Sequence, residues 1–299
     1  INDEQFLKLC EMIDAERERV LNHSLDSFEE GLLACVFDSL DRVQHMFFKG
    51  REDVIEAWYI RLDQMIGRIA ERASRKKKTR ILIVSDHGFG RFDYKVHLNK
   101  WLVERGYLKT TDSASSDLRT VDWSKTQAYA LGLNSLYLNI AGREGKGIVD
   151  ENAAMQTLAK LKDDLLQWKG SNGEQVVQTA LIRTEAFQGP LAAYGPDIFV
   201  GYRPPYRGSA ETGLGQWRSE AIEKNVEHWE ADHCFDSKTV PGVLFFNEGL
   251  GNFPSPSYRD IPALTIGKDL KAQASAPPPK YSHEDQDEIE KRLRDLGYL

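Results

Sequence analysis

The sequence is poor in cysteine, has no long apolar run and carries no excess of positive charge. Its three cysteines, Cys10, Cys35 and Cys234, are odd in number and far apart, which favours buried thiols over a disulfide framework. No apolar stretch approaches the roughly 20 residues of a membrane helix. The net charge of -7 argues against a general nucleic-acid-binding surface. The composition is otherwise typical of a soluble globular protein.

The sequence also lacks an initiator methionine, a visible signal peptide and any internal repeat. It begins at Ile1 and continues at once into a charged helical segment, so we expect a fragment without its own N-terminal part. The glycine-rich stretch 143–147 lacks the spacing of a Walker loop, which excludes a nucleotide cradle there.

Apolar periodicity predicts both helices and strands, and therefore an α/β fold. The expected helices are 3–20, 53–73, 96–106, 150–168 and, after a proline linker at 277–279, 283–297. The expected strands are 31–37, 80–84, 135–140, 176–182, 197–200 and 242–246. We expect one domain over 1–299 with a central, mostly parallel sheet flanked by helices. A less regular insertion at about 109–230 would cover the site.

The stretch 84–90 is the one around which the chain is organised. Asp86 and His87 directly follow a predicted strand, and in open α/β sheets chemistry collects where the chain leaves the carboxyl end of a strand. Gly88 and Gly90 let the backbone turn sharply beside them. Most such Asp-His pairs are capped turns or solvated loops, so this pair is only a candidate for metal binding.

Three separated clusters of acid and histidine share this character. They are Asp41 with His45, Asp86 with His87, and Asp232 with His233. The i, i+4 spacing of the first pair places both side chains on one helical face. Carboxylate oxygen and neutral imidazole nitrogen suit Zn²⁺, or Mn²⁺ where oxygen dominates. For each histidine taken alone, an ordinary core or surface role stays open.

Two further polar features are expected to have no catalytic part. His97 is expected to pack or cap at the start of the helix 96–106. The basic run 75–78 is expected to be a solvated connection between a helix and a strand.

The segments 37–45 and 84–90, followed late in the chain by Asp232-His233, resemble the metal-site sequence of the type I phosphodiesterase/nucleotide pyrophosphatase family. This family belongs to the alkaline phosphatase superfamily, and its pattern is Asp-x-x-x-His, then Ser-Asp-His-Gly, then a late His. The segments 97–108, 194–197 and 292–299 are similar to its bacterial and archaeal branch. The resemblance covers nearly the whole chain and implies an alkaline-phosphatase-like sheet, truncated at its N-terminal side.

The resemblance also implies a ligand set. Asp41, His45 and His233 would hold one divalent ion, and Asp86 with His87 would help to hold a second; zinc is expected, with manganese as the alternative.

The resemblance further implies an N-terminal Asp and a Thr or Ser nucleophile. We expect both upstream of this sequence, because no matching strand with Asp and Thr or Ser precedes Asp41. Ser24 and Ser27 lie in a polar stretch without a preceding strand and are not assigned the role.

Supporting residues are expected around these ligands. Asp232 would orient His233 or its loop, and Asp38 would do the same for Asp41. Arginine recognises phosphate, and aromatic rings stack on bases. Candidates for substrate contact are therefore Arg203, Arg207, Tyr206 and Trp217. The alternative is that these residues belong to a solvated loop.

The predicted function is the metal-dependent hydrolysis of a small-molecule phosphate ester, a diester or a pyrophosphate. A sulfatase or phosphomutase of the same superfamily is an alternative, because fold does not settle substrate. A non-catalytic metal-binding domain that lacks the nucleophile is a second alternative. We expect this chain alone to be inactive, and no nucleic-acid scaffold or membrane segment is expected.

Overall fold

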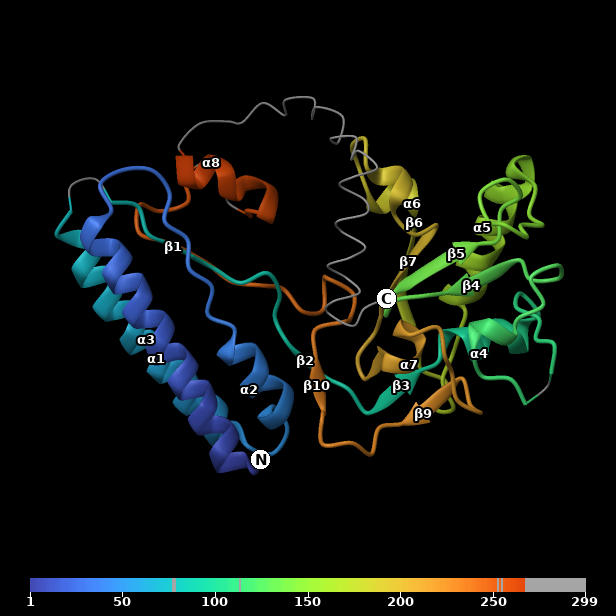
Figure 1. Cartoon of the computed structure of the whole chain (residues 1–299), viewed down its shortest axis with the longest axis horizontal. Helices are drawn as coiled ribbons and strands as arrows, with labels where there is room; N and C mark the ends of the chain where they lie inside the picture. The colour runs from blue at the N-terminus through green and yellow to red at the C-terminus, as the bar shows by residue number, and fades with distance from the viewer. Residues whose placement is uncertain (77–78, 113, 252, 254, 267–299) are drawn as a thin grey trace, which may run out of the picture.

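The computed structural model describes residues 1–76, 79–112, 114–251, 253 and 255–266. Figure 1 shows the long helices together at one end of the molecule and most of the strands at the other. Within these described ranges, no helix combines the length and apolarity needed to cross a membrane. The predicted linker at 277–279 and helix at 283–297 lie outside them.

Three helices form the N-terminal part of the chain. α1 (Asp3–Ser27) and α3 (Glu52–Ser74) lie side by side, and α2 (Ser39–Phe47) packs against both (Figure 1). Reciprocal hydrogen bonds between Asn2 and Gln5 cap the start of α1. The three helices bury a small apolar core of Cys10, Val43, Phe47, Val54 and Trp58. This core fixes the helix that carries Asp41 and His45.

The largest core lies in the strand-rich part. Its sheet is antiparallel, in the order β4-β5-β7-β6. These strands are β4 (Ala128–Ala130), β5 (Ser135–Leu138), β6 (Val177–Ile182) and β7 (Ile198–Tyr202). The helices α4 (Leu98–Arg105) and α5 (Glu151–Leu166) pack on it. Much of this core belongs to the region 109–230.

Short ladders connect this sheet to the rest of the chain. β3 (Tyr94–Val96) pairs with β8 (Tyr206–Gly208) in parallel and with β9 (Ile222–Lys224) antiparallel. β2 (Gly90–Arg91) pairs with β10 (Ala231–Asp232), and β1 (Leu82–Val84) with β11 (Leu244–Phe246), both antiparallel. The remaining helices and 3₁₀ turns are α6 (Arg183–Ala186), α7 (Ala210–Gly213), α8 (Ile261–Ile266), η1 (Leu118–Thr120), η2 (Ala192–Tyr194) and η3 (Tyr258–Asp260).

The mixed α/β character agrees with the prediction, but the central, mostly parallel sheet is not confirmed. Among the named strands in the described ranges, only β3 and β8 pair in parallel. The predicted strand 31–37 has no assigned strand structure, with Leu32 70% and Val36 76% exposed. The reason is physical, since an apolar run becomes a strand only when a partner backbone pairs with it.

The four helices predicted within the described residues are found close to their expected bounds, because helical periodicity is a local property. α1 runs further than predicted, to Ser27. α4 ends at Gly106, which has the left-handed φ of 80° expected of a C-terminal glycine. α5 ends at Leu166, slightly before the expected end at 168, with Gln167 as its C-cap.

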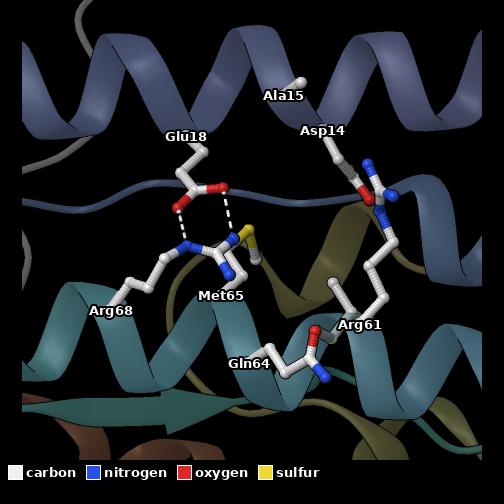
Figure 2. A pocket seen from close by; sticks show the side chains of 8 residues that line it. Asp14, Ala15, Glu18, Arg61, Gln64, Met65 and Arg68 are labelled. Atoms are coloured by element: carbon white, nitrogen blue, oxygen red, sulfur yellow. Dashed lines mark hydrogen bonds and ion pairs between the residues drawn. The ribbon is translucent and has the colours of Figure 1, made fainter.

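A cavity of about 150 Å³ lies between α1 and α3 (Figure 2). Glu18 of α1 and Arg68 of α3 close one side with two hydrogen bonds of 2.8 Å. Asp14 extends from α1 on the other side and is 2% exposed. Neither of its carboxylate oxygens has a hydrogen-bond partner among the described residues. Burial raises the pKa of this carboxyl, and the nearby Ser39 hydroxyl and Arg61 charge offset only part of that effect.

Replacement of Asp14 by Asn is expected to stabilise the chain at pH 7, because it removes a carboxyl whose pKa is raised by burial. A carboxyl whose pKa is raised by folding is neutral in both states at low pH. It opposes folding once the pH rises above the unfolded value of 3.8, where the unfolded chain ionises first. The advantage of Asp14→Asn in urea unfolding should therefore grow from about pH 4 upward. Asp63→Asn, on the exposed face of α3, controls for the change in net charge; an equal gain from this variant would contradict the explanation.

Candidate metal centre

Four candidate ligands from three separate segments meet at one place. Asp41 and His45 come from α2, His87 follows β1, and His233 follows β10. Asp41 Oδ2 lies 3.5 Å from His45 Nε2, and Asp41 Oδ1 lies 3.5 Å from His233 Nε2. Ligand atoms of Asp41, His87 and His233 all lie within 4.8 Å of one another, which is close enough to share an ion.

His45 is held with one nitrogen directed at this group. Its Nδ1 lies 2.7 Å from the backbone carbonyl oxygen of Ala231. Because a carbonyl only accepts, Nδ1 carries the proton, and Nε2 of the neutral ring keeps a lone pair facing Asp41. The ring is buried, with Phe89 at its edge (4.8 Å between centroids) and Trp229 stacked on its face (3.9 Å).

His87 is oriented in the same manner by its own loop. Its Nδ1 lies 3.0 Å from the carbonyl oxygen of Gly88, which again leaves Nε2 available. The ring stacks on His233 with 3.7 Å between centroids. The N–H of Gly88 donates to the carbonyl oxygen of Val240 at 2.8 Å. Glycine is favoured at this position because a Cβ would lie 2.5 Å from the carbonyl oxygen of Pro241.

The surroundings of His233 favour its neutral imidazole, and one carboxylate oxygen nearby has no donor. Burial lowers the pKa of His233 below its ordinary value, and the neighbouring His87 adds to the effect. Asp41 Oδ1 is buried and has no hydrogen-bond partner in the described part of the chain. A divalent cation placed here would interact favourably with this oxygen and with imidazole nitrogens that carry a lone pair.

Asp232 is close enough to His45 and His233 to be a ligand, but its oxygens already have partners. Oδ2 accepts from the Arg207 guanidinium at 2.7 Å and from the Trp229 indole at 3.3 Å. Oδ1 accepts the backbone N–H groups of His233 (2.7 Å) and Cys234 (3.0 Å). Burial alone would raise the pKa of Asp232, but the charge of Arg207 and these hydrogen bonds outweigh it and lower the pKa to about 2.

Two other predicted acids are not members of the closest groups of ligand atoms. Asp86 lies at the edge of the site, since its side chain is 87% exposed and its Oδ1 lies 3.5 Å from His87 Nε2. Asp38 forms ion pairs with Arg17 and Arg42 instead of contacting Asp41. Burial raises the pKa of Asp38, but the hydrogen bonds from the two arginines lower it overall. Asp38 therefore ties α1 to the start of α2.

The residues considered for substrate contact do not gather at the ligand group. Arg203 is exposed, while Tyr206 and Trp217 are buried in the large core. Arg207 is engaged by Asp232 and lies over the Phe92 ring at 5.5 Å. His97 is fully buried, with Nε2 3.0 Å from Glu223.

Two aromatic residues were missed by the sequence reasoning. Phe89 lies between His45, His87 and His233, with ring centroids 4.8, 5.9 and 5.5 Å away. Its position inside the segment 84–90 was a usable signal. Trp229 gives no comparable signal, because only folding reveals its stack on His45.

Comparison with known proteins identifies the family of the chain. The family model described as type I phosphodiesterase / nucleotide pyrophosphatase matches residues 3–199, more than half of the chain. The chain belongs to the type I phosphodiesterase/nucleotide pyrophosphatase family. The resemblance inferred from the motifs is thereby confirmed. The family consists of hydrolases, which supports the prediction that the protein is an enzyme. His233 and Asp232 lie beyond the matched residues, and no curated protein matches the chain.

Replacement of Arg207 by Ala is expected to destabilise the chain by about 3–5 kcal/mol, because it leaves the buried Asp232 carboxylate without its ion-pair partner. Urea unfolding would measure this loss. Arg203→Ala is a matched control on the neighbouring exposed surface and should change stability by less than about 0.5 kcal/mol. Equal losses in the two variants would show that the Arg207–Asp232 pair is not the cause.

Proposed function

We propose that this chain carries a two-metal centre of a phosphate-ester hydrolase that acts on diesters or pyrophosphates. The observation that supports this most is the convergence of Asp41, His45, His87 and His233 from three segments. Membership of a phosphodiesterase/nucleotide pyrophosphatase family gives the reaction class. A small-molecule phosphate ester is the substrate that fits this family.

The proposed ligands form two sets. Asp41, His45 and His233 would hold the first ion, and His87 with Asp86 would help to hold the second. The mixture of imidazole nitrogen and carboxylate oxygen suits zinc, with manganese as the alternative. A pair of divalent ions supplies charge stabilisation for the attacking and leaving oxygens of phosphoryl transfer.

The protein's own contribution is to orient these ligands. The Ala231 and Gly88 carbonyls fix the tautomers of His45 and His87 so that both present Nε2. Asp232 fixes the backbone at His233, and Arg207 neutralises Asp232. The aromatic side chains of Phe89 and Trp229 limit the access of water around His45.

The nucleophile is proposed to be a Thr or Ser that lies upstream of Ile1. Ser24 and Ser27 donate to carbonyls within α1. Ser39 donates to the Cys10 carbonyl, and Ser85 accepts the N–H of Val243. These hydroxyls are thus engaged in structural hydrogen bonds.

Calorimetric titration of the chain with Zn²⁺ is expected to show a tight event and a weaker one, because the first set offers three side-chain ligands and the second only two. Replacement of His233 by Ala should weaken the tight event by at least about tenfold. His228→Ala is a matched control, since His228 is an exposed histidine of the same segment. Absence of zinc binding by the unaltered chain would overturn the proposed function, whereas a tight event unchanged by His233→Ala would overturn the assignment of ligands.

Turnover provides a separate test. With Zn²⁺ or Mn²⁺ added, the chain alone is expected to hydrolyse a chromogenic phosphodiester no faster than the metal ion alone does. A rate clearly above that background would show that a nucleophile is present in this chain.

A further inference from the structure

Trp229 occupies an unusual place beside the candidate metal centre. One face of its ring stacks on His45, with 3.9 Å between centroids and 27° between planes. Its indole N–H donates to Asp232 Oδ2 at 3.3 Å. The side chain is nevertheless 39% exposed, so burial of apolar surface does not by itself explain its position.

The segment that carries Trp229 is anchored on both sides. The Asn225 side chain donates to the Trp229 carbonyl oxygen at 2.7 Å. Glu230 pairs with Lys49, just after α2, at 3.0 Å, and the carbonyl oxygen of Glu230 accepts the N–H of Phe92 at 3.0 Å. The next carbonyl, that of Ala231, binds His45. The indole is therefore held in a fixed position relative to α2 and to the loop of His233.

This position links the two histidines of the first ligand set. The contact to Ala231 fixes one atom of the His45 ring, Nδ1, and the indole stacked on the face of the ring restricts the tilt of its plane. Asp232, which receives the indole N–H, is also the acceptor for the backbone N–H of His233. One side chain thus contacts His45 directly and His233 through the carboxylate that orients it.

We propose that Trp229 is a positioning residue of the metal centre, which sets the orientation of His45 by stacking and that of His233 through Asp232. This inference rests on the proposed function, because it assumes that these histidines bind a metal ion. Removal of such a supporting side chain is expected to weaken metal binding by about 10–100-fold without removing any ligand.

The test compares three variants of the whole chain by zinc calorimetry. Trp229→Ala loses both the stack and the hydrogen bond, and its tight event should weaken by about 10–100-fold. Trp229→Phe keeps an aromatic ring but loses the N–H, so it should recover most of the affinity and remain about threefold weaker than the unaltered chain. Trp123→Phe, in the distant strand-rich part, is the matched control and should bind zinc like the unaltered chain.

A spectroscopic measurement separates positioning from general stability. In the chain loaded with Co²⁺ in place of zinc, the visible absorption bands report ligand geometry, and they should change in Trp229→Ala and return towards normal in Trp229→Phe. Intrinsic fluorescence should also respond to zinc, because Trp229 stacks on a ligand, and this response should be lost in Trp229→Phe but kept in Trp123→Phe.

The outcomes distinguish the two proposals. If the unaltered chain binds no zinc, both are overturned. If it binds zinc, and both Trp229 variants bind zinc with the affinity of the unaltered chain and show its cobalt bands, only the positioning role is overturned. Should Trp229→Ala fail to fold, Trp229→Phe decides, since unchanged zinc affinity together with an unchanged fluorescence response would contradict the role.

Discussion

The candidate centre depends on one buried carboxylate, that of Asp232. It binds two groups. One is the side chain of Arg207, the middle residue of β8, and the other is the backbone N–H of His233, directly after β10. An ion buried this deeply is tolerated only when its hydrogen-bonding capacity is satisfied, and each oxygen of Asp232 has more than one donor. The charge pair thus ties β8 to β10, and β10 in turn packs against α2 of the helical part.

The remaining ligands are placed by backbone features with little tolerance for change. His87 follows the short strand β1, and the next residue, Gly88, packs closely against the backbone at Val240 and Pro241. Asp41 and His45 are placed by a single helix whose opposite face is buried against α1 and α3. Helix α2 and the two turns thus bring together ligands that lie far apart in the sequence, from Asp41 to His233.

The sequence predicted the parts of this arrangement that are local. The spacing of Asp41 and His45 determined that they share a helical face, and α2 places them so. The long helices were predictable because each one's periodicity is contained within it. The sheet was not, because β1 pairs with β11, from a distant part of the chain, and pairing between strands is invisible to a local pattern. The proximity of His233 to Asp41 followed only from a family resemblance, and the stack of Trp229 on His45 from neither source.

The extended segment 31–37 affects how the chain behaves in solution. Its residues are uncharged, contain no proline and are largely apolar, and Leu32 and Val36 face solvent. In addition, the β1–β11 ladder has only two strands in the described ranges, and Val84, Val243 and Phe245 are exposed there. Open strand edges with apolar side chains favour the addition of further strands from other molecules. We therefore expect the chain to self-associate through these segments as its concentration rises.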